Sequence, residues 1–158
     1  MTIKILIAED HELTRKGISY GLKSYNEIDV IGGFEDGKQT LDFIEKSPIQ
    51  PDVVLLDIIM PVLNGIDTAK KIREMNPGIK IIMLTSVNEK ETVLRAFNAG
   101  ANAYAMKNIS FEKLVSVIKM VLNGEVWIAP NIADYILDVL SIKAEDVLPA
   151  KTAEDFKL

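Results

Sequence analysis

The chain has 158 residues, 48% of them hydrophobic, and a formal net charge of −5 at pH 7, which predicts one globular domain and argues against a nucleic-acid-binding surface rich in Lys and Arg. Cysteine is absent and His11 is the single histidine, which excludes disulfides, Cys-ligated zinc and a His-rich metal site, so any bound metal is expected to be a hard ion with oxygen ligands. No apolar run approaches the roughly 20 residues that cross a bilayer, and acidic residues come too early for a signal peptide, so we expect a cytoplasmic protein without membrane contact.

Short apolar runs rich in β-branched residues recur along the chain. They are "IKILIA" (3–8), "IDVIGG" (28–33), "DVVLLD" (52–57), "IKIIMLT" (79–85) and "NAYAM" (102–106). The segments between these runs carry apolar residues at helical spacing. Strands that alternate with helices predict a parallel sheet covered by helices on both faces, so we expect a doubly wound α/β domain over residues 1–124.

The sequence after this domain predicts one more helix and then a linker. Asn123–Gly124 is a usual helix C-terminal signal, and Pro130 suits the first turn of an additional helix within residues 125–141. The apolar stripe of that helix consists of Ile132, Ile136, Val139 and Leu140. Residues 142–158 repeat Ala-Glu-Asp and contain Pro149, which indicates a linker.

The positions that follow the predicted strands are unusually polar. They are Glu9 and Asp10 after the first strand, Asp57 after the third, Thr85 and Ser86 near the end of the fourth, and Lys107 after the fifth. In open parallel sheets ligands bind beyond the carboxyl ends of the strands, so we expect these side chains to share one pocket. A charge beside the buried run that precedes Asp57 is costly unless it is paired, which points to a function for that carboxylate.

Three carboxylates without a Cys or His ligand favour magnesium (Mg2+), which prefers oxygen ligands and a phosphate nearby. A carboxylate can attack phosphorus and form an aspartyl-phosphate, and Asp57 is the best nucleophile because its strand is central in the predicted sheet. Thr85 would then donate a hydrogen bond to a phosphoryl oxygen, and Lys107 would balance its charge. Taken singly, each of these residues also suits a helix cap or a solvated surface, so the prediction depends on the whole set.

The chain resembles the receiver domain of two-component response regulators over residues 3 to about 122. The motifs that carry the likeness are the acidic pair in "ILIAED", the phospho-acceptor loop "LLDIIMPVLNG", the threonine in "MLTS", and the aromatic residue and lysine in "AYAMK". The resemblance implies a flavodoxin-like fold with five parallel strands in the order 2-1-3-4-5, to which this chain adds an extra C-terminal helix.

The resemblance also assigns roles to individual residues. It implies that a histidine kinase phosphorylates Asp57 and that Thr85 and Tyr104 form the conformational switch. The expected Mg2+ ligands are Glu9, Asp10, Asp57 and the backbone carbonyl of Ile59. The partner-binding face is expected on the fourth helix, fifth strand and fifth helix, and includes Lys90, Arg95, Asn98, Tyr104 and Lys113.

The stretch "VLNGEVWIAPNIADYIL" resembles the subfamily whose output domain is a LuxR-type helix-turn-helix. This likeness implies homodimerisation on phosphorylation, and DNA binding only through a C-terminal domain toward which residues 142–158 would lead. No enzymatic activity is expected beyond autodephosphorylation. That reaction is expected to be slow, because Ile59 and Val87 are apolar where other receivers place groups that guide water.

Other functions stay open at this point. One is a phosphorylation-independent module that docks proteins, which the complete set of site residues disfavours. Another is an Mg2+-dependent phosphatase of the haloacid dehalogenase type, but that family requires a second aspartate two residues after the nucleophile, where this chain has Ile59. A nucleotide-binding module is disfavoured because no Gly-rich fingerprint follows the first strand.

Overall fold

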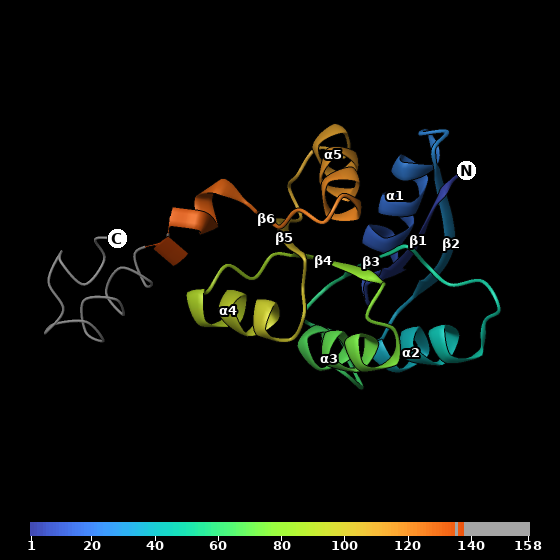
Figure 1. Ribbon diagram of the computed structural model, residues 1–158, viewed down its shortest axis with the longest axis horizontal. Coiled ribbons are helices and arrows are strands. Elements are labelled where there is room, and N and C mark those ends of the chain that lie inside the picture. The colour runs from blue at the N-terminus through green and yellow to red at the C-terminus, as the bar shows by residue number, and fades with distance from the viewer. Residues whose placement is uncertain (135, 138–158) are drawn as a thin grey trace, which may run out of the picture.

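The computed structural model describes residues 1–134 and 136–137, which form a parallel sheet with helices on both faces (Figure 1). The strands are β1 (Ile3–Ala8), β2 (Ile28–Phe34), β3 (Val53–Leu56), β4 (Lys80–Thr85), β5 (Ala103–Met106) and β6 (Trp127–Ile128). The helices are α1 (Glu12–Lys23), α2 (Gly37–Lys46), α3 (Gly65–Met75), α4 (Lys90–Asn98) and α5 (Phe111–Leu122).

The sheet has the order β2-β1-β3-β4-β5-β6, which confirms the predicted α/β fold and its order 2-1-3-4-5. The prediction of five strands was wrong by one, because Trp127 and Ile128 pair in parallel with Ala103 and Tyr104 of β5. Two residues are too few to show the alternation of polar and apolar positions by which a strand is recognised in a sequence.

Helices α1 and α5 cover one face of the sheet, and α2, α3 and α4 cover the other (Figure 1). Successive residues of a strand point to opposite faces, and β1 shows this directly. Ile5 and Ile7 join the apolar core beneath α1 and α5, whereas Leu6 and Ala8 join the core beneath the other three helices. Central strands buried on both faces therefore consist almost entirely of apolar residues, and polar side chains are left to the strand ends.

Local capping features mark both ends of α5. The Ser110 side chain accepts a hydrogen bond from the backbone N–H of Lys113 at 3.1 Å and so caps α5. The helix ends at Leu122 with Asn123 as its C-cap, and Gly124 follows with φ 86°, a conformation that glycine adopts without steric cost. The C-terminal end of α5 lies where the Asn123–Gly124 signal predicted it.

A further helical segment follows β6 and is formed by residues 130–134 and 136–137; we call it the C-terminal helix. Ile132 and Ile136 of its predicted apolar stripe are buried. The stripe's other members, Val139 and Leu140, and the predicted linker over 142–158 lie outside the described residues.

Among the described residues, no helix combines the length and the apolar composition that crossing a bilayer requires.

Candidate functional site

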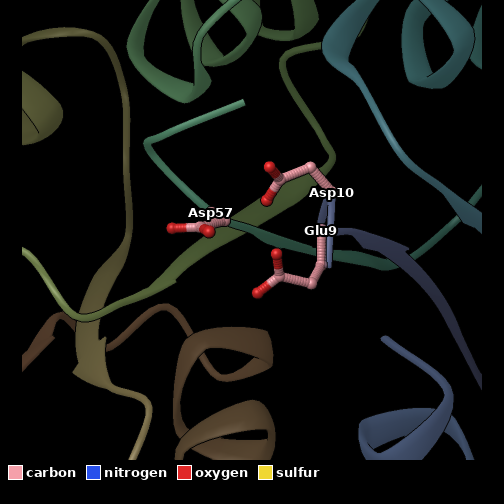
Figure 2. A group of neighbouring side chains, drawn as sticks. All are labelled: Glu9, Asp10 and Asp57. Carbon is pink, nitrogen blue, oxygen red and sulfur yellow. The ribbon is translucent and has the colours of Figure 1, made fainter. Parts of the chain in front are cut away.

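Three carboxylates meet at the carboxyl ends of β1 and β3. Glu9 and Asp10 follow β1 directly, and Asp57 follows β3. One oxygen from each of the three carboxylates lies within 4.8 Å of the others, and Figure 2 shows the side chains projecting next to one another. Glu9 and Asp57 are 2% and 5% exposed, whereas Asp10 lies at the surface. The adjacency follows from the topology, since β1 and β3 are neighbouring parallel strands.

The Asp57 carboxylate is held by hydrogen bonds at both oxygens. The backbone N–H of Ile58 donates to Oδ1 at 2.7 Å, and Lys107 Nζ donates to Oδ2 at 2.9 Å. Lys107 follows β5 and also forms an ion pair with Glu9 Oε1. These contacts orient Asp57 toward the sheet edge and give the buried charge a partner.

The electrostatic balance of this cluster is incomplete. Burial raises the pKa of Glu9, and the neighbouring carboxylates Asp10 and Asp57 add to the increase, while Lys107 opposes it. Burial would lower the pKa of Lys107, but its contacts with Glu9 and Asp57 outweigh that effect and raise it. Lys107 is therefore a firmly protonated cation, yet it brings one positive charge to three carboxylates. Negative charge left over at a pocket favours binding of a further cation.

A pocket of about 210 Å³ opens beside the carboxylates and is lined by Asp10, Asp57, Ile59, Thr85, Ser86, Val87 and Lys107. Thr85 is the last residue of β4 and is buried. Its Oγ1 accepts a hydrogen bond from the backbone N–H of Val87 at 3.3 Å, which leaves the hydroxyl proton available to a ligand. Ile59 is 66% exposed and contributes an apolar wall.

Two backbone features shape the loop between β3 and α3. A Cβ atom on Gly65 would lie 2.0 Å from the carbonyl oxygen of Asp57, so only glycine allows the chain to pass this close to the site. Val62 has φ 69°, and the N–H of Leu63 donates to the carbonyl of Pro61 at 2.7 Å, which closes a tight turn. A β-branched residue with positive φ is strained, so this loop stores strain beside Asp57.

Tyr104 lies inside the molecule, which corrects the expectation that it contributes to an exposed partner-binding face. Its side chain is fully buried, and its hydroxyl donates to the backbone carbonyl of Val87 at 2.6 Å. Burial raises the pKa of this hydroxyl well above its ordinary value near 10, and the charges of Asp57 and Glu89 raise it further. The hydroxyl therefore stays protonated and connects β5 with the loop that follows Thr85.

Two residues that support Glu9 were not singled out from the sequence. The Arg15 guanidinium donates to the carbonyl of Glu9 at 2.7 Å, and the backbone N–H of His11 donates to Glu9 Oε2 at 3.0 Å. His11 is also the N-cap of α1, where its side chain accepts from the backbone of Thr14. The sequence signal for this support is weak. It consists of the acidic pair Glu9–Asp10, followed within six positions by the start of a helix and by Arg15.

Comparison with known proteins agrees with this geometry. The model of the family described as response regulator receiver domain matches residues 5–119. The response regulator protein VraR of Staphylococcus saprophyticus is 36% identical over 126 residues, which cover 79% of this chain and 59% of that protein. The chain thus spans less than two thirds of the length of this curated relative.

Solved structures show the same fold. A two-component response regulator of the LuxR family from Aurantimonas sp. SI85-9A1 superposes with a TM-score of 0.81 at 26% identity and covers 89% of this chain and 99% of that chain. The signal receiver domain of NarL from Mycobacterium tuberculosis has a TM-score of 0.73 at 25% identity and covers 78% of this chain and 98% of that one.

The similarity to a LuxR-family regulator supports the predicted subfamily. Because the family model spans most of the chain, and the sheet order is the one that the resemblance implied, the chain belongs to the response regulator receiver domain family.

Proposed function

We propose that the chain is a phosphorylation-activated signalling switch that accepts a phosphoryl group on Asp57. The observation that carries this proposal is the placement of Asp57: the residue is 5% exposed, and its carboxylate lies beside Glu9 and Asp10 and is held by Lys107 at the edge of a pocket. A buried carboxylate with this many charged neighbours is costly unless the site binds a ligand.

In the proposed reaction a carboxylate oxygen of Asp57 attacks the phosphorus atom of a phosphohistidine on a histidine kinase. An O–P bond forms at Asp57, the P–N bond breaks, and the imidazole nitrogen of the kinase keeps the electron pair. The Lys107 ammonium would balance the charge on the phosphoryl oxygens, and the Thr85 hydroxyl would donate to one of them. Thr85 and Tyr104 would then form the conformational switch.

The donor set fits Mg2+. Glu9, Asp10 and Asp57 offer carboxylate oxygens within 4.8 Å of one another, and the backbone carbonyl of Ile59 is the expected fourth ligand. Hard oxygen ligands around a small octahedral ion are the usual arrangement for magnesium, and bound Mg2+ would neutralise charge on both the carboxylates and the phosphoryl oxygens.

The proposal extends to the partners and to the domain organisation. Residues 1–124 would form the receiver domain, followed by an additional helix over 125–141 and a linker over 142–158. The receiver would be cytoplasmic and its partner would be a histidine kinase, phosphorylation would favour a homodimer, and DNA binding would belong to a separate C-terminal output domain. Beyond slow autodephosphorylation, the receiver would have no enzymatic activity.

The test is the intact mass of the protein after incubation with acetyl phosphate and Mg2+. A single adduct of about 80 Da is expected from a phosphoryl group on an aspartyl nucleophile. It should be absent in Asp57→Ala and present in Asp29→Ala, in which a surface carboxylate on the edge strand β2 is removed instead.

The same experiment separates the competing functions. A wild-type protein that never gains mass would support a phosphorylation-independent docking module. Repeated hydrolysis of small phosphate esters would support a phosphatase. Size-exclusion chromatography of the phosphorylated and unphosphorylated samples tests the proposed dimerisation.

A further inference from the structure

The C-terminal helix packs on the side of the sheet that α4 covers. Ile132 and Ile136 are 0% and 8% exposed and belong to the same apolar core as Val93, Ala96 and Tyr104. By contrast, Leu137 of the same helix is 62% exposed. The apolar stripe of the helix thus packs on the α4–β5 side, and its opposite face is exposed to solvent. The α4–β5 side belongs to the face that was expected from the sequence to contact partner proteins.

A continuous series of contacts joins the phospho-acceptor pocket to this helix. Thr85 lines the pocket with Asp57, and its Oγ1 accepts from the N–H of Val87 at 3.3 Å. The carbonyl of Val87 accepts from the Tyr104 hydroxyl at 2.6 Å. The carbonyl of Tyr104 in turn accepts from the N–H of Ala129 at 3.0 Å, directly before the C-terminal helix begins. Tyr104 therefore connects Val87, which lines the pocket, with Ala129 at the start of the helix.

Tyr104 couples the two regions because its position satisfies two requirements at once. Its ring packs near Phe97 of α4, with ring centroids 6.5 Å apart, and lies in the core that contains Ile132. Its buried hydroxyl needs an acceptor, and the carbonyl of Val87 supplies it. A shift of the loop at Val87 would leave that hydroxyl unpaired, which is costly inside a core, so the ring and the packing around it would have to move too.

We infer that the occupied phospho-acceptor pocket and the docked C-terminal helix stabilise each other, and that the α4–β5 side is an intramolecular docking surface for this helix. The inference rests on the proposed function. A phosphoryl group on Asp57 would hold the Thr85 hydroxyl and, through it, the loop at Val87. This loop position preserves the bond to Tyr104 and with it the surface on which Ile132 and Ile136 pack.

The first test is amide hydrogen exchange, measured by mass spectrometry on the full chain with and without beryllofluoride and Mg2+, which together mimic the phosphoryl group. The protection of peptides from the segment 127–137 should increase by about fivefold or more, the usual lower range of coupling between two sites. Tyr104→Phe removes only the hydroxyl that bonds to Val87 and should abolish the increase. Asp57→Ala should show no response to the probe.

The second test uses reciprocity, because coupling between two binding equilibria acts equally in both directions. Ile132→Ser undocks the helix and should weaken beryllofluoride binding by about fivefold or more, whereas Leu137→Ser, a matched change on the exposed side, should leave it within about twofold. If circular dichroism shows that Ile132→Ser does not fold, Ile136→Ala, a milder change near the end of the described helix, replaces it.

Occupancy of the pocket is verified independently by 19F NMR of the bound beryllofluoride. Occupancy without a change in protection over 127–137, or equal affinities of Ile132→Ser and Leu137→Ser, would overturn the inference and leave the proposed function intact. No binding of the probe to the wild type, together with no acetyl phosphate adduct, would overturn the proposed function and the inference with it.

Discussion

Two partly buried cations lie at opposite ends of the sheet, and their surroundings differ in kind. At the amino ends of β4 and β5, the acceptors that the Arg73 guanidinium has in the described part of the chain are all neutral oxygens. Its acceptors are the carbonyls of Pro77 at 2.8 Å, Ile79 at 2.7 Å and Gly100 at 2.6 Å, and Asn102 Oδ1 at 3.0 Å. At the carboxyl ends, Lys107 contacts the carboxylates of Glu9 and Asp57.

The difference separates a structural site from a binding site. Around Arg73 the hydrogen bonds tie two loops to α3, and no carboxylate of residues 1–134 and 136–137 is among the acceptors. Burial lowers the pKa of the guanidinium. Around Lys107 the negative charge of three carboxylates exceeds the positive charge of one ammonium, beside an open pocket. A polar set whose groups satisfy one another holds the fold together, whereas a set left with excess charge at a pocket is suited to a ligand.

Replacing the two cations tests this distinction, and the largest effect is expected at the carboxyl end. Lys107→Ala should slow phosphorylation of Asp57 by acetyl phosphate by about a hundredfold or more, because it removes a fixed positive charge from the transferring group. Arg73→Ala should leave the rate within about threefold of wild type, since Arg73 stabilises the fold without touching the pocket. The measurement is a time course of adduct formation by intact mass. Equal losses in both variants would contradict the distinction.

For the free energy of unfolding, a large effect is expected from the replacement of Arg73. Arg73→Ala removes the donor of four hydrogen bonds, of whose acceptors Asn102 Oδ1 keeps the N–H of Ile81. It should lower the free energy of unfolding by about 3 kcal/mol, as measured by urea denaturation. Lys71→Ala, an exposed residue two positions earlier in α3, should change it by no more than about 0.5 kcal/mol. A loss of stability in Arg73→Ala no larger than in Lys71→Ala would show that water replaces the guanidinium without cost.

The location of the candidate site could be predicted from the sequence because each polar residue directly follows an apolar run. Parallel strands end at the same edge, so Asp57 after "VVLL" and Thr85 at the end of "IIMLT" had to lie together once the fold class was recognised. The structure places them around one pocket, and their roles in phosphoryl transfer stay predictions.

What could not be predicted depends on packing between distant segments. Tyr104 is amphipathic and suits either a surface or a core; its burial is decided by Phe97 and by the carbonyl of Val87. Arg73 lies in α3, yet its guanidinium reaches loop residues 27 and 29 positions later in the chain. Local spacing carries no information about such contacts.

Because of the excess negative charge at the carboxyl ends of the strands, we expect the stability of the protein to depend on pH and on metal. The raised pKa of Glu9 means that the folded protein binds this proton more tightly than the unfolded chain does. Stability conferred by the neutral carboxyl is therefore lost as pH rises from the ordinary pKa of 4.5 through the folded-state pKa. Without metal at pH 7, Glu9→Gln should thus be more stable than wild type by about 1 kcal/mol, a typical gain when an unfavourable functional group is removed.

Thermal unfolding in EDTA at pH 4 and pH 7 checks this expectation, and the advantage of Glu9→Gln should shrink at the lower pH. Saturating Mg2+ should reverse the order at pH 7, because a ligand that binds only the folded state at 100 times its Kd adds about 2.7 kcal/mol, and an amide is a poorer ligand than a carboxylate. A variant that is less stable than wild type in EDTA at both pH values would show that the carboxylates are balanced after all.

The smallest expected effect concerns how long the phosphoryl group persists. Ile59, which is 66% exposed, and Val87 both line the pocket. Because both side chains are apolar, neither can orient a water molecule for attack on the phosphorus atom. Ile59→Asn places a polar side chain at the same position and should speed autodephosphorylation by about threefold, a small part of what a well-positioned catalytic group contributes. Decay of the adduct after removal of acetyl phosphate measures this rate. Ile59→Leu keeps the wall apolar and is the matched control; equal acceleration in both variants would indicate looser packing rather than water positioning.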